Sequence, residues 1–366
     1  MSIPRLYSID TAAMQPIALG GAFLGTGGGG DPYIGRLLAE QAINDNGPVG
    51  VIDVTDLADD ALVVPVAMMG APTVMLEKLP RGDEAQSALQ ALEAYLGKKA
   101  DAIFCIEAGG LNSTIPIAVA AACGLPIVDG DAMGRAFPEL QMVSMTMHDI
   151  PACPMVMADD KGNSLVLNTV DNLSTEKFAR VITVEMGGAG LIALYPMTGA
   201  QAKLATLRKS MSLIHSIGSL ITSEQAANRN PADRLAKDLS GVRLFEGRVM
   251  DVDRRTEGGF ARGTCSLQGL GPDTGGSLVL EFQNEFLLAR TEAGEPRAMT
   301  PDLICLLDLE TGQPITTEQI RYGFRVIVFG LPCDPQWRSE KGLALVGPGY
   351  FGYEVAYQAI EKLNSM

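Results

Sequence analysis

One segment rich in glycine could bind an anion through the backbone alone. It is the run Gly25-Thr26-Gly27-Gly28-Gly29-Gly30-Asp31-Pro32, which comes just before the start of a predicted helix. Unhindered N–H groups ahead of a helix N-terminus form a concave donor surface for an anion or an enolate-like oxygen. We expect Gly27, Gly28 and Gly29 to contact a substrate. The alternative is a helix-to-helix turn capped by Asp31.

The same run is not a nucleotide-binding motif. A dinucleotide fingerprint needs a strand before its glycines, whereas apolar residues at helical spacing precede them here, over Ser8 to Leu24. No neighbouring lysine completes a phosphate-binding P-loop. We therefore expect neither NAD nor a nucleotide as cofactor.

A second candidate segment, CIEAGGLNS at residues 105–113, follows a predicted strand and begins a helix. Ligands of open α/β sheets bind at the carboxyl edge of the strands, where Glu107 would act as an acid, a base or a metal ligand. Gly109 and Gly110 would let the backbone approach a substrate, and Asn112 would bind it. In the alternative reading, Asn112 only caps the helix and Glu107 only accepts N–H groups.

The third candidate, DGDAMGRAFPEL at residues 129–140, follows the next predicted strand directly. Asp129 and Asp131 are close enough to share a proton or a cation, and Arg135 can hold a planar pair of substrate oxygens. We expect these three residues to be catalytic, and Asp129, Asp131 and Glu139 to be the ligands of a divalent metal, if one is bound. Alternatively, the acids form turns and Arg135 is their ion-pair partner.

The remaining candidates are single side chains. The chain has only 2 histidines, which excludes a zinc site of three histidines. His148, placed at the end of a helix expected to begin at Pro138, could protonate a leaving group. Tyr350, in the aromatic loop 347–353, could close over a planar ring or simply pack. Cys105 is read as a small buried hydrophobe, although a nucleophilic role stays open.

The elements that must position these residues alternate between strand and helix in the first half. Strands are predicted at Gly50–Val54, Ala61–Met69, Ala102–Glu107 and Pro126–Val128, and helices at Ser8–Leu24, Asp31–Ile43, Glu84–Leu96 and Ser113–Ala122. Such alternation needs crossover connections. It predicts an α/β N-terminal domain with a mostly parallel sheet.

The second half has a different pattern. One long amphipathic helix is expected over Gly199–Ala227, capped by Thr198 and bridging the two halves. Period-two segments follow, at Arg243–Asp253, Ser277–Phe282, Phe286–Arg290, Leu303–Asp308 and Arg325–Phe329. They predict a β-rich C-terminal domain. We divide the chain into residues 1–168 and 169–366.

Composition and charge limit the classes of molecule that the protein can bind. The 366 residues are 47% hydrophobic and 19% charged, as in an ordinary globular protein, and the net charge of -15 disfavours nucleic acid. No apolar run reaches the length of a membrane span, and the N-terminal residues do not resemble a signal peptide. The 6 dispersed cysteines read as reduced thiols. We expect a cytoplasmic homo-oligomer that acts on a small molecule.

Taken together, these motifs resemble the S-methyl thiohydantoin desulfurase family, which is often labelled hydantoinase-like. The resemblance is carried by LGTGGGGDP (24–32), EAGGLNS (107–113), GLPIVDGDAMGRAFPELQM (124–142), EMGG (185–188), PDLICLLDLETGQPI (301–315) and VGPGYFGY (346–353). These segments span nearly the whole chain.

The resemblance implies hydrolysis of a five-membered cyclic ureide or thiohydantoin-type ring. In the named activity, water replaces methanethiol at the carbon between the two ring nitrogens and leaves a hydantoin. The alternative function is a non-catalytic small-molecule-binding or regulatory subunit that associates with a hydantoinase-type enzyme. The two differ in geometry, because an enzyme should bring Glu107, the acidic loop and the glycine run around one pocket.

Overall fold

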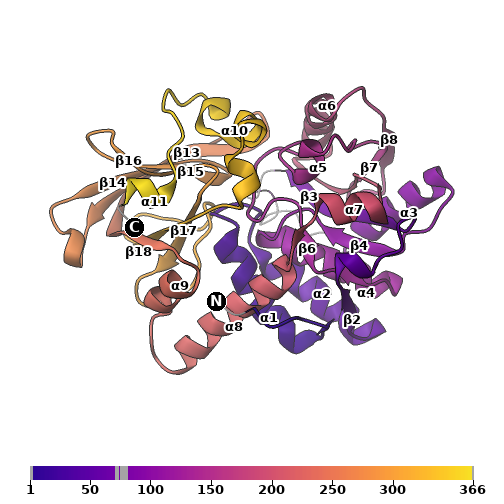
Figure 1. Cartoon of the computed structure of the whole chain (residues 1–366), viewed down its shortest axis with the longest axis horizontal. Coiled ribbons are helices and arrows are strands. Elements are labelled where there is room, and N and C mark those ends of the chain that lie inside the picture. The colour runs from indigo at the N-terminus through magenta and orange to yellow at the C-terminus, as the bar shows by residue number, and fades with distance from the viewer. Residues whose placement is uncertain (1–2, 71–73, 75–80, 365–366) are drawn as a thin grey trace.

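The protein consists of an α/β half and a β-rich half, which lie side by side in Figure 1. The computed structural model describes residues 3–70, 74 and 81–364. The α/β half is built mainly from the first half of the chain, and the β-rich half from the last third. The predicted two-part architecture is therefore confirmed.

The sheet of the α/β half is mixed rather than mostly parallel. Its strand order is β1-β2-β5-β4-β3-β9-β7-β8. The strands are β1 (Ser8–Ile9), β2 (Val49–Ile52), β3 (Leu62–Gly70), β4 (Ala102–Cys105), β5 (Ile127–Val128), β7 (Met155–Ala158), β8 (Ser164–Leu167) and β9 (Ala189–Ala193). Only β2, β5, β4 and β3 run parallel to one another, and the other pairs are antiparallel.

The parallel strands decide where the site lies. β3, β4 and β5 are parallel neighbours and end at one edge of the sheet. β9 comes from residues beyond 168 and still joins this sheet, between β3 and β7. The predicted domain boundary between residues 168 and 169 therefore does not separate the two sheets. As a boundary between domains it stays a prediction.

Helices α3 (Glu84–Leu96) and α4 (Ile115–Cys123) pack on the sheet, and α2 (Pro32–Asn46) packs on α4. The expected helices over Asp31–Ile43 and Glu84–Leu96 are confirmed. Helix α1 (Thr11–Leu24) starts later than predicted, because Ser8 belongs to β1. Its cap is Asp10, whose Oδ1 accepts a hydrogen bond from the Ala13 N–H at 3.0 Å.

The predicted single helix over Gly199–Ala227 is wrong. It is broken into α7 (Gly199–Ala205) and α8 (Ser210–Ala226). Between them, β11 (Leu207–Arg208) pairs with β6 (Gly130–Asp131), and Lys209 has a left-handed backbone conformation with a φ of 68°. The strand pairing outweighs the helical periodicity of the sequence. The Thr198 cap is confirmed as a capping box with Gln201.

The β-rich half is one antiparallel sheet in the order β16-β15-β14-β13-β12-β18-β17. Its strands are β12 (Val242–Glu257), β13 (Phe260–Gly269), β14 (Ser277–Gln283), β15 (Glu285–Thr291), β16 (Pro296–Met299), β17 (Leu303–Asp308) and β18 (Arg325–Leu331). The sheet curls, so that β15 and β16 approach β17. Its interior is a separate apolar core that includes Val249, Leu280 and Phe286. None of the helices described is long and apolar enough to span a membrane.

Candidate functional site

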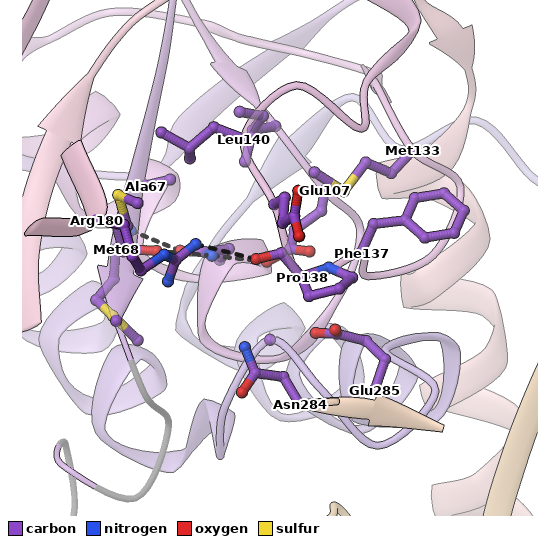
Figure 2. A pocket seen from close by; sticks show the side chains of 16 residues that line it. Ala67, Met68, Glu107, Met133, Phe137, Pro138, Leu140, Arg180, Asn284 and Glu285 are labelled. Carbon is purple, nitrogen blue, oxygen red and sulfur yellow. Dashed lines mark hydrogen bonds between the residues drawn. The ribbon is translucent and has the colours of Figure 1, made fainter. Parts of the chain in front are cut away.

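A small cavity of about 50 Å³ lies where the two halves meet (Figure 2). The α/β half contributes the ends of β3 and β4 and the loop after Met133, and the glycine run contributes Gly29. The β-rich half contributes Asn284 and Glu285, from the turn between β14 and β15. The cavity therefore requires both halves and lies at the carboxyl edge of the parallel strands, as the sequence predicts.

Glu107 reaches the cavity from the loop that follows β4. Its Oε1 accepts a hydrogen bond from Asn112 Nδ2 at 2.6 Å, while its buried Oε2 has no hydrogen-bond partner. Burial raises the pKa of Glu107 to about 8, against the opposing effect of the Asn112 hydrogen bond. The carboxyl group therefore retains a proton near neutral pH and has one oxygen free to accept another group.

Asn112 fixes the position of Glu107. Its Oδ1 accepts from the Met68 N–H at 2.7 Å, and its Nδ2 donates to the Met68 carbonyl at 3.2 Å as well as to Glu107. These bonds tie the end of β3 to the loop after β4. Asn112 is thus more than a helix cap, because α4 begins only at Ile115.

Glu285 faces the same cavity from the opposite half of the molecule (Figure 2). It is 2% exposed, and its Oε2 has no hydrogen-bond partner. Burial, followed by the nearby charge of Glu107, raises its pKa well above the ordinary value, against the effects of Arg135 and of the backbone N–H of Gly29. Glu107 and Glu285 therefore form a coupled pair of buried carboxyl groups.

The glycine run supports Glu285 directly. A Cβ atom added at Gly28 would lie 1.9 Å from Glu285 Oε1, so a larger residue there would have to displace this carboxyl group. The run is also joined to the β-rich half by backbone hydrogen bonds from Phe286 N–H to the Thr26 carbonyl at 2.7 Å and from Thr317 N–H to the Gly27 carbonyl at 2.8 Å. Gly27 itself contacts Phe286, and Gly29 lines the cavity.

Gly109 and Gly110 pack against the glycine run instead of lining the cavity. A Cβ atom at Gly109 would lie 3.1 Å from Gly25 Cα, and one at Gly110 would lie 2.3 Å from the Gly30 carbonyl oxygen. Their small size lets the two loops approach closely. Of the substrate-binding residues predicted from sequence, Gly29 and Asn112 line the cavity itself.

The two aspartates of the acidic loop, Asp129 and Asp131, lie away from the cavity, although some residues from Met133 onward line it. Asp131 accepts four hydrogen bonds, from the N–H groups of Ala108, Met133 and Gly134 and from the Ser210 hydroxyl at 2.6 Å. Asp129 accepts from both the N–H and the hydroxyl of Ser212. Neither residue lines the cavity. Asp131 thus holds its own loop, as the turn-forming alternative expects, and both aspartates also accept hydrogen bonds from the start of α8, which the sequence did not predict.

The predicted metal ligands are not brought together. Glu139 lines the cavity and its Oε2 accepts from Tyr350 Oη at 2.6 Å, whereas Asp129 and Asp131 lie at α8. Within the part of the chain that the structure describes, no group of three or more His, Cys, Asp or Glu side chains is arranged to hold a metal ion.

Arg135 is fully buried and joins the two halves of the molecule. Its guanidinium donates to the carbonyls of Ala136, Pro301, Asp302 and Phe286 and to the Thr26 hydroxyl, over 2.8 to 3.2 Å. These bonds use all five N–H groups of an arginine. The arginine that does line the cavity is Arg180, whose Nε donates to Glu176 at 2.7 Å.

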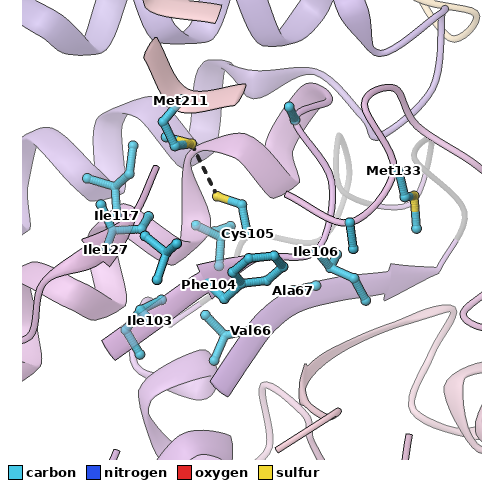
Figure 3. Close-up of a cluster of buried hydrophobic side chains, with 14 of the residues drawn as sticks. Val66, Ala67, Ile103, Phe104, Cys105, Ile106, Ile117, Ile127, Met133 and Met211 are labelled. Atoms are coloured by element: carbon cyan, nitrogen blue, oxygen red, sulfur yellow. Dashed lines mark hydrogen bonds between the residues drawn. The ribbon is translucent and has the colours of Figure 1, made fainter. Parts of the chain in front are cut away.

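His148 and the cysteines also lie outside the cavity. His148 is exposed after α5 (Ser144–Met147), and the helix expected to begin at Pro138 is absent. Cys105 lies in an apolar cluster, and its thiol contacts Met211 Sδ at 3.5 Å (Figure 3). Burial raises its pKa well above the ordinary value, which disfavours the thiolate that a nucleophile needs.

Sequence reasoning missed Glu285. It lies between two predicted strands, in the segment FQNEFLLAR, where an acidic residue reads as part of a turn. The turn is so tight that Gln283 pairs with Glu285, and Asn284 has a left-handed φ of 57°. Reciprocal hydrogen bonds between Asn284 and Ala261 hold it in place. The sequence feature that could have identified Glu285 is an acidic residue directly before the apolar run Phe286 to Ala289.

Fold and site together define a two-domain protein with a carboxyl-lined cavity between an α/β half and a curled β-sheet. Two family models match the chain in tandem: the S-Me-THD-like, N-terminal domain over residues 12–169 and the S-Me-THD-like, C-terminal domain over residues 170–360. The chain belongs to the S-Me-THD-like family, which confirms the resemblance seen in its motifs.

A solved structure has the same architecture. The X-ray crystal structure of a protein from Chromobacterium violaceum is similar to this chain with a TM-score of 0.80 and 25% sequence identity, over 97% of this chain and 100% of that chain. No curated protein matches the sequence.

Proposed function

We propose that the protein hydrolyses a five-membered cyclic ureide or thiohydantoin-type ring, with conversion of an S-methyl thiohydantoin to a hydantoin and methanethiol as the reference reaction. Membership of the S-Me-THD-like family supports the ring class. The observation that carries the hydrolytic role is the pair Glu107 and Glu285, two buried carboxyl groups that reach one cavity from opposite halves.

Such a pair suits general acid–base catalysis because its members ionise unequally. The Asn112 hydrogen bond favours the charged form of Glu107, whereas the charge of Glu107 disfavours ionisation of Glu285. Glu107 therefore loses its proton first and is assigned as the base. Glu285 keeps its proton and is assigned as the acid.

The reaction then proceeds in two balanced steps. Water attacks the ring carbon between the two nitrogens, Glu107 accepts the proton that water loses, and Glu285 protonates the nitrogen that receives the electron pair of the C=N bond. The carbon–sulfur bond then breaks, and Glu107 returns its proton to the departing sulfur. Glu285 takes the hydroxyl proton as the carbonyl forms, which restores both carboxyl groups.

The test is release of methanethiol from S-methyl thiohydantoins by the wild type and by Glu107→Gln and Glu285→Gln variants. Loss of an acid or base typically lowers the rate by about a hundredfold or more. Glu318→Gln is the matched control, because Glu318 is 6% exposed, has two unpartnered oxygens and does not line the cavity. It should retain activity.

The results separate the two candidate functions. Normal turnover by both cavity variants would contradict the assigned roles. Binding of the ring by the wild type without release of thiol would instead favour the binding or regulatory subunit. A divalent metal stays a prediction of the sequence, and no step above passes through one.

A further inference from the structure

The cavity at Glu107 and Glu285 is too small for a substituted ring. Its volume is about 50 Å³, whereas an engineered protein cavity that binds benzene has about 150 Å³. The reacting carbon fits between the carboxyl groups only if the rest of the substrate extends into a neighbouring space. Such a placement of the substrate rests on the proposed function.

A second cavity of about 450 Å³ has Gln141 in its wall, next in the chain to Pro138, Glu139 and Leu140, which line the first cavity. Both halves of the molecule line it, since Leu345 and Tyr350 belong to the β-rich half and α6 (Asn172–Glu185) to the α/β half. Its wall is mainly apolar, through Ile150, Pro151, Val170, Leu173 and Leu345.

Three polar side chains form the partition between the two cavities. Glu139 lines the first cavity, while Gln141 and Tyr350 line the second. Glu139 Oε2 accepts from Tyr350 Oη and from Gln141 Nε2, each at 2.6 Å, and Gln141 Nε2 also donates to Tyr350 Oη at 3.0 Å. We call Glu139, Gln141 and Tyr350 the partition.

The partition contains an unused hydrogen-bond acceptor. Gln141 is 3% exposed, and its Oε1 is buried without a partner. A buried amide oxygen without a partner costs free energy that a bound donor would recover. This is a second observation, besides the cavity itself, that points to a ligand.

The charges around the second cavity select against an anion. Asp149 and Asp171 line it, Glu139 is hydrogen-bonded to its lining residues Gln141 and Tyr350, and Lys341 already pairs with Asp149 at 3.1 Å. Asp171 caps α6, where it accepts from the Ser174 N–H at 2.7 Å. The walls thus favour an uncharged apolar group over a carboxylate.

We propose that the second cavity is the subsite for an uncharged apolar substituent on the ring. The ring would lie against Glu107 and Glu285, with its substituent directed past the partition toward Leu173 and Leu345. A ring N–H or a donor on the substituent would bond Gln141 Oε1. The preferred substrates are then rings with a branched alkyl or benzyl group.

The test compares kcat/KM for an unsubstituted ring and for rings bearing isobutyl, benzyl or carboxyethyl groups. We expect the isobutyl and benzyl rings to exceed the unsubstituted ring by about tenfold or more, and the carboxyethyl ring to gain nothing. Leu173→Trp, at a residue 43% exposed, should fill the subsite and remove this preference, so that kcat/KM falls more for the isobutyl and benzyl rings than for the unsubstituted ring. Leu204→Trp is the control, since Leu204 is 61% exposed and lines neither cavity.

Calorimetric binding of the corresponding hydantoin products separates the two proposals. Turnover of all rings with equal kcat/KM, or an equal loss on every ring in Leu173→Trp, would overturn the subsite and leave the proposed function in place. Tighter binding of the isobutyl than of the unsubstituted product, abolished in Leu173→Trp, would support the subsite even if no ring were hydrolysed. Equal binding of both products without hydrolysis would overturn both proposals.

Discussion

Burial of Glu107 and Glu285 lowers the stability of the fold, because each carboxyl group keeps one oxygen without a hydrogen-bond partner. A purely structural position would be more stable with an apolar residue or an amide. Buried groups with perturbed pKa values cluster at functional sites, and these two lie in one cavity. By contrast, Asp131 is as deeply buried but has its hydrogen bonds satisfied.

Position along the chain predicts part of this site. Glu107 and Asn112 follow a strand whose carboxyl end faces the ligand edge, and the structure places both there. The same argument singled out Asp129 and Asp131, but sequence alone does not show that Ser210 and Ser212 of α8 bind them. The role of Glu285 could not be predicted, because its place in the cavity depends on how the two halves dock, and no local sequence pattern contains that information.

Asn112 should set the pH dependence of the proposed reaction. In the wild type, kcat/KM should rise with pH until Glu107, whose pKa is raised to about 8, has ionised. Asn112→Leu removes the donor that favours the ionised form, so the rising limb should move to higher pH. A pH–rate profile measures this shift.

The control for that measurement is Glu318→Gln, which should leave the rising limb of the pH–rate profile at the same pH as in the wild type. A profile that falls in amplitude without moving along the pH axis would mean that Asn112 only supports the fold.

At the scale of elements, α8 packs along α1, which in turn contacts β17 of the β-rich half. It crosses α1 at two glycines: a Cβ atom at Gly20 would lie 1.8 Å from the Ile214 carbonyl oxygen, and one at Gly218 would lie 1.7 Å from that of Pro16. The sequence predicted one long helix over Gly199–Ala227 that includes Gly218. The contact explains the glycine, and the break at β11 escaped prediction because a two-residue strand has no periodicity.

Gly218→Ala should therefore destabilise the protein despite the better helix propensity of alanine, which by itself would stabilise by about 1 kcal/mol. The clash is with backbone, which cannot rotate away, and overpacking of this kind costs about 1 to 3 kcal/mol. Urea unfolding measures the change. Gly50→Ala, at a glycine with nothing within 4 Å of the added Cβ, should change stability little. An unchanged midpoint in Gly218→Ala would show that α1 and α8 separate easily.

At the scale of the molecule, the site exists only because the two halves dock. Arg135 and the glycine run both lie at this junction, and each joins the α/β half to the β-rich half through hydrogen bonds. The fold class of each half could be predicted from hydrophobic periodicity. Their relative placement could not, because it depends on contacts between residues more than 100 positions apart, such as Arg135 with Pro301.

Buried acids, two of them in the cavity between the halves, should make the protein less stable as pH rises. Burial raises the pKa of Asp131 to about 6, of Glu318 to about 7 and of Glu107 to about 8, so the folded state holds protons that the unfolded chain has released. The free energy of unfolding therefore falls with increasing pH across this range, by up to about 1.4 kcal/mol per pKa unit of each group. His215, whose pKa burial lowers, opposes this trend as a single half-buried group.

Replacing both cavity acids, as Glu107→Gln with Glu285→Gln, should flatten this dependence and raise stability at pH 8 by roughly 2 kcal/mol, because no charge then has to form in the cavity. Urea unfolding at pH 5, 6.5 and 8 measures the slope, and the exposed Glu257→Gln should leave it unchanged. The same double variant should lose turnover, which would show that activity is maintained at the expense of stability. A wild-type stability that increases from pH 5 to 8 would contradict the burial of protonated acids between the two halves.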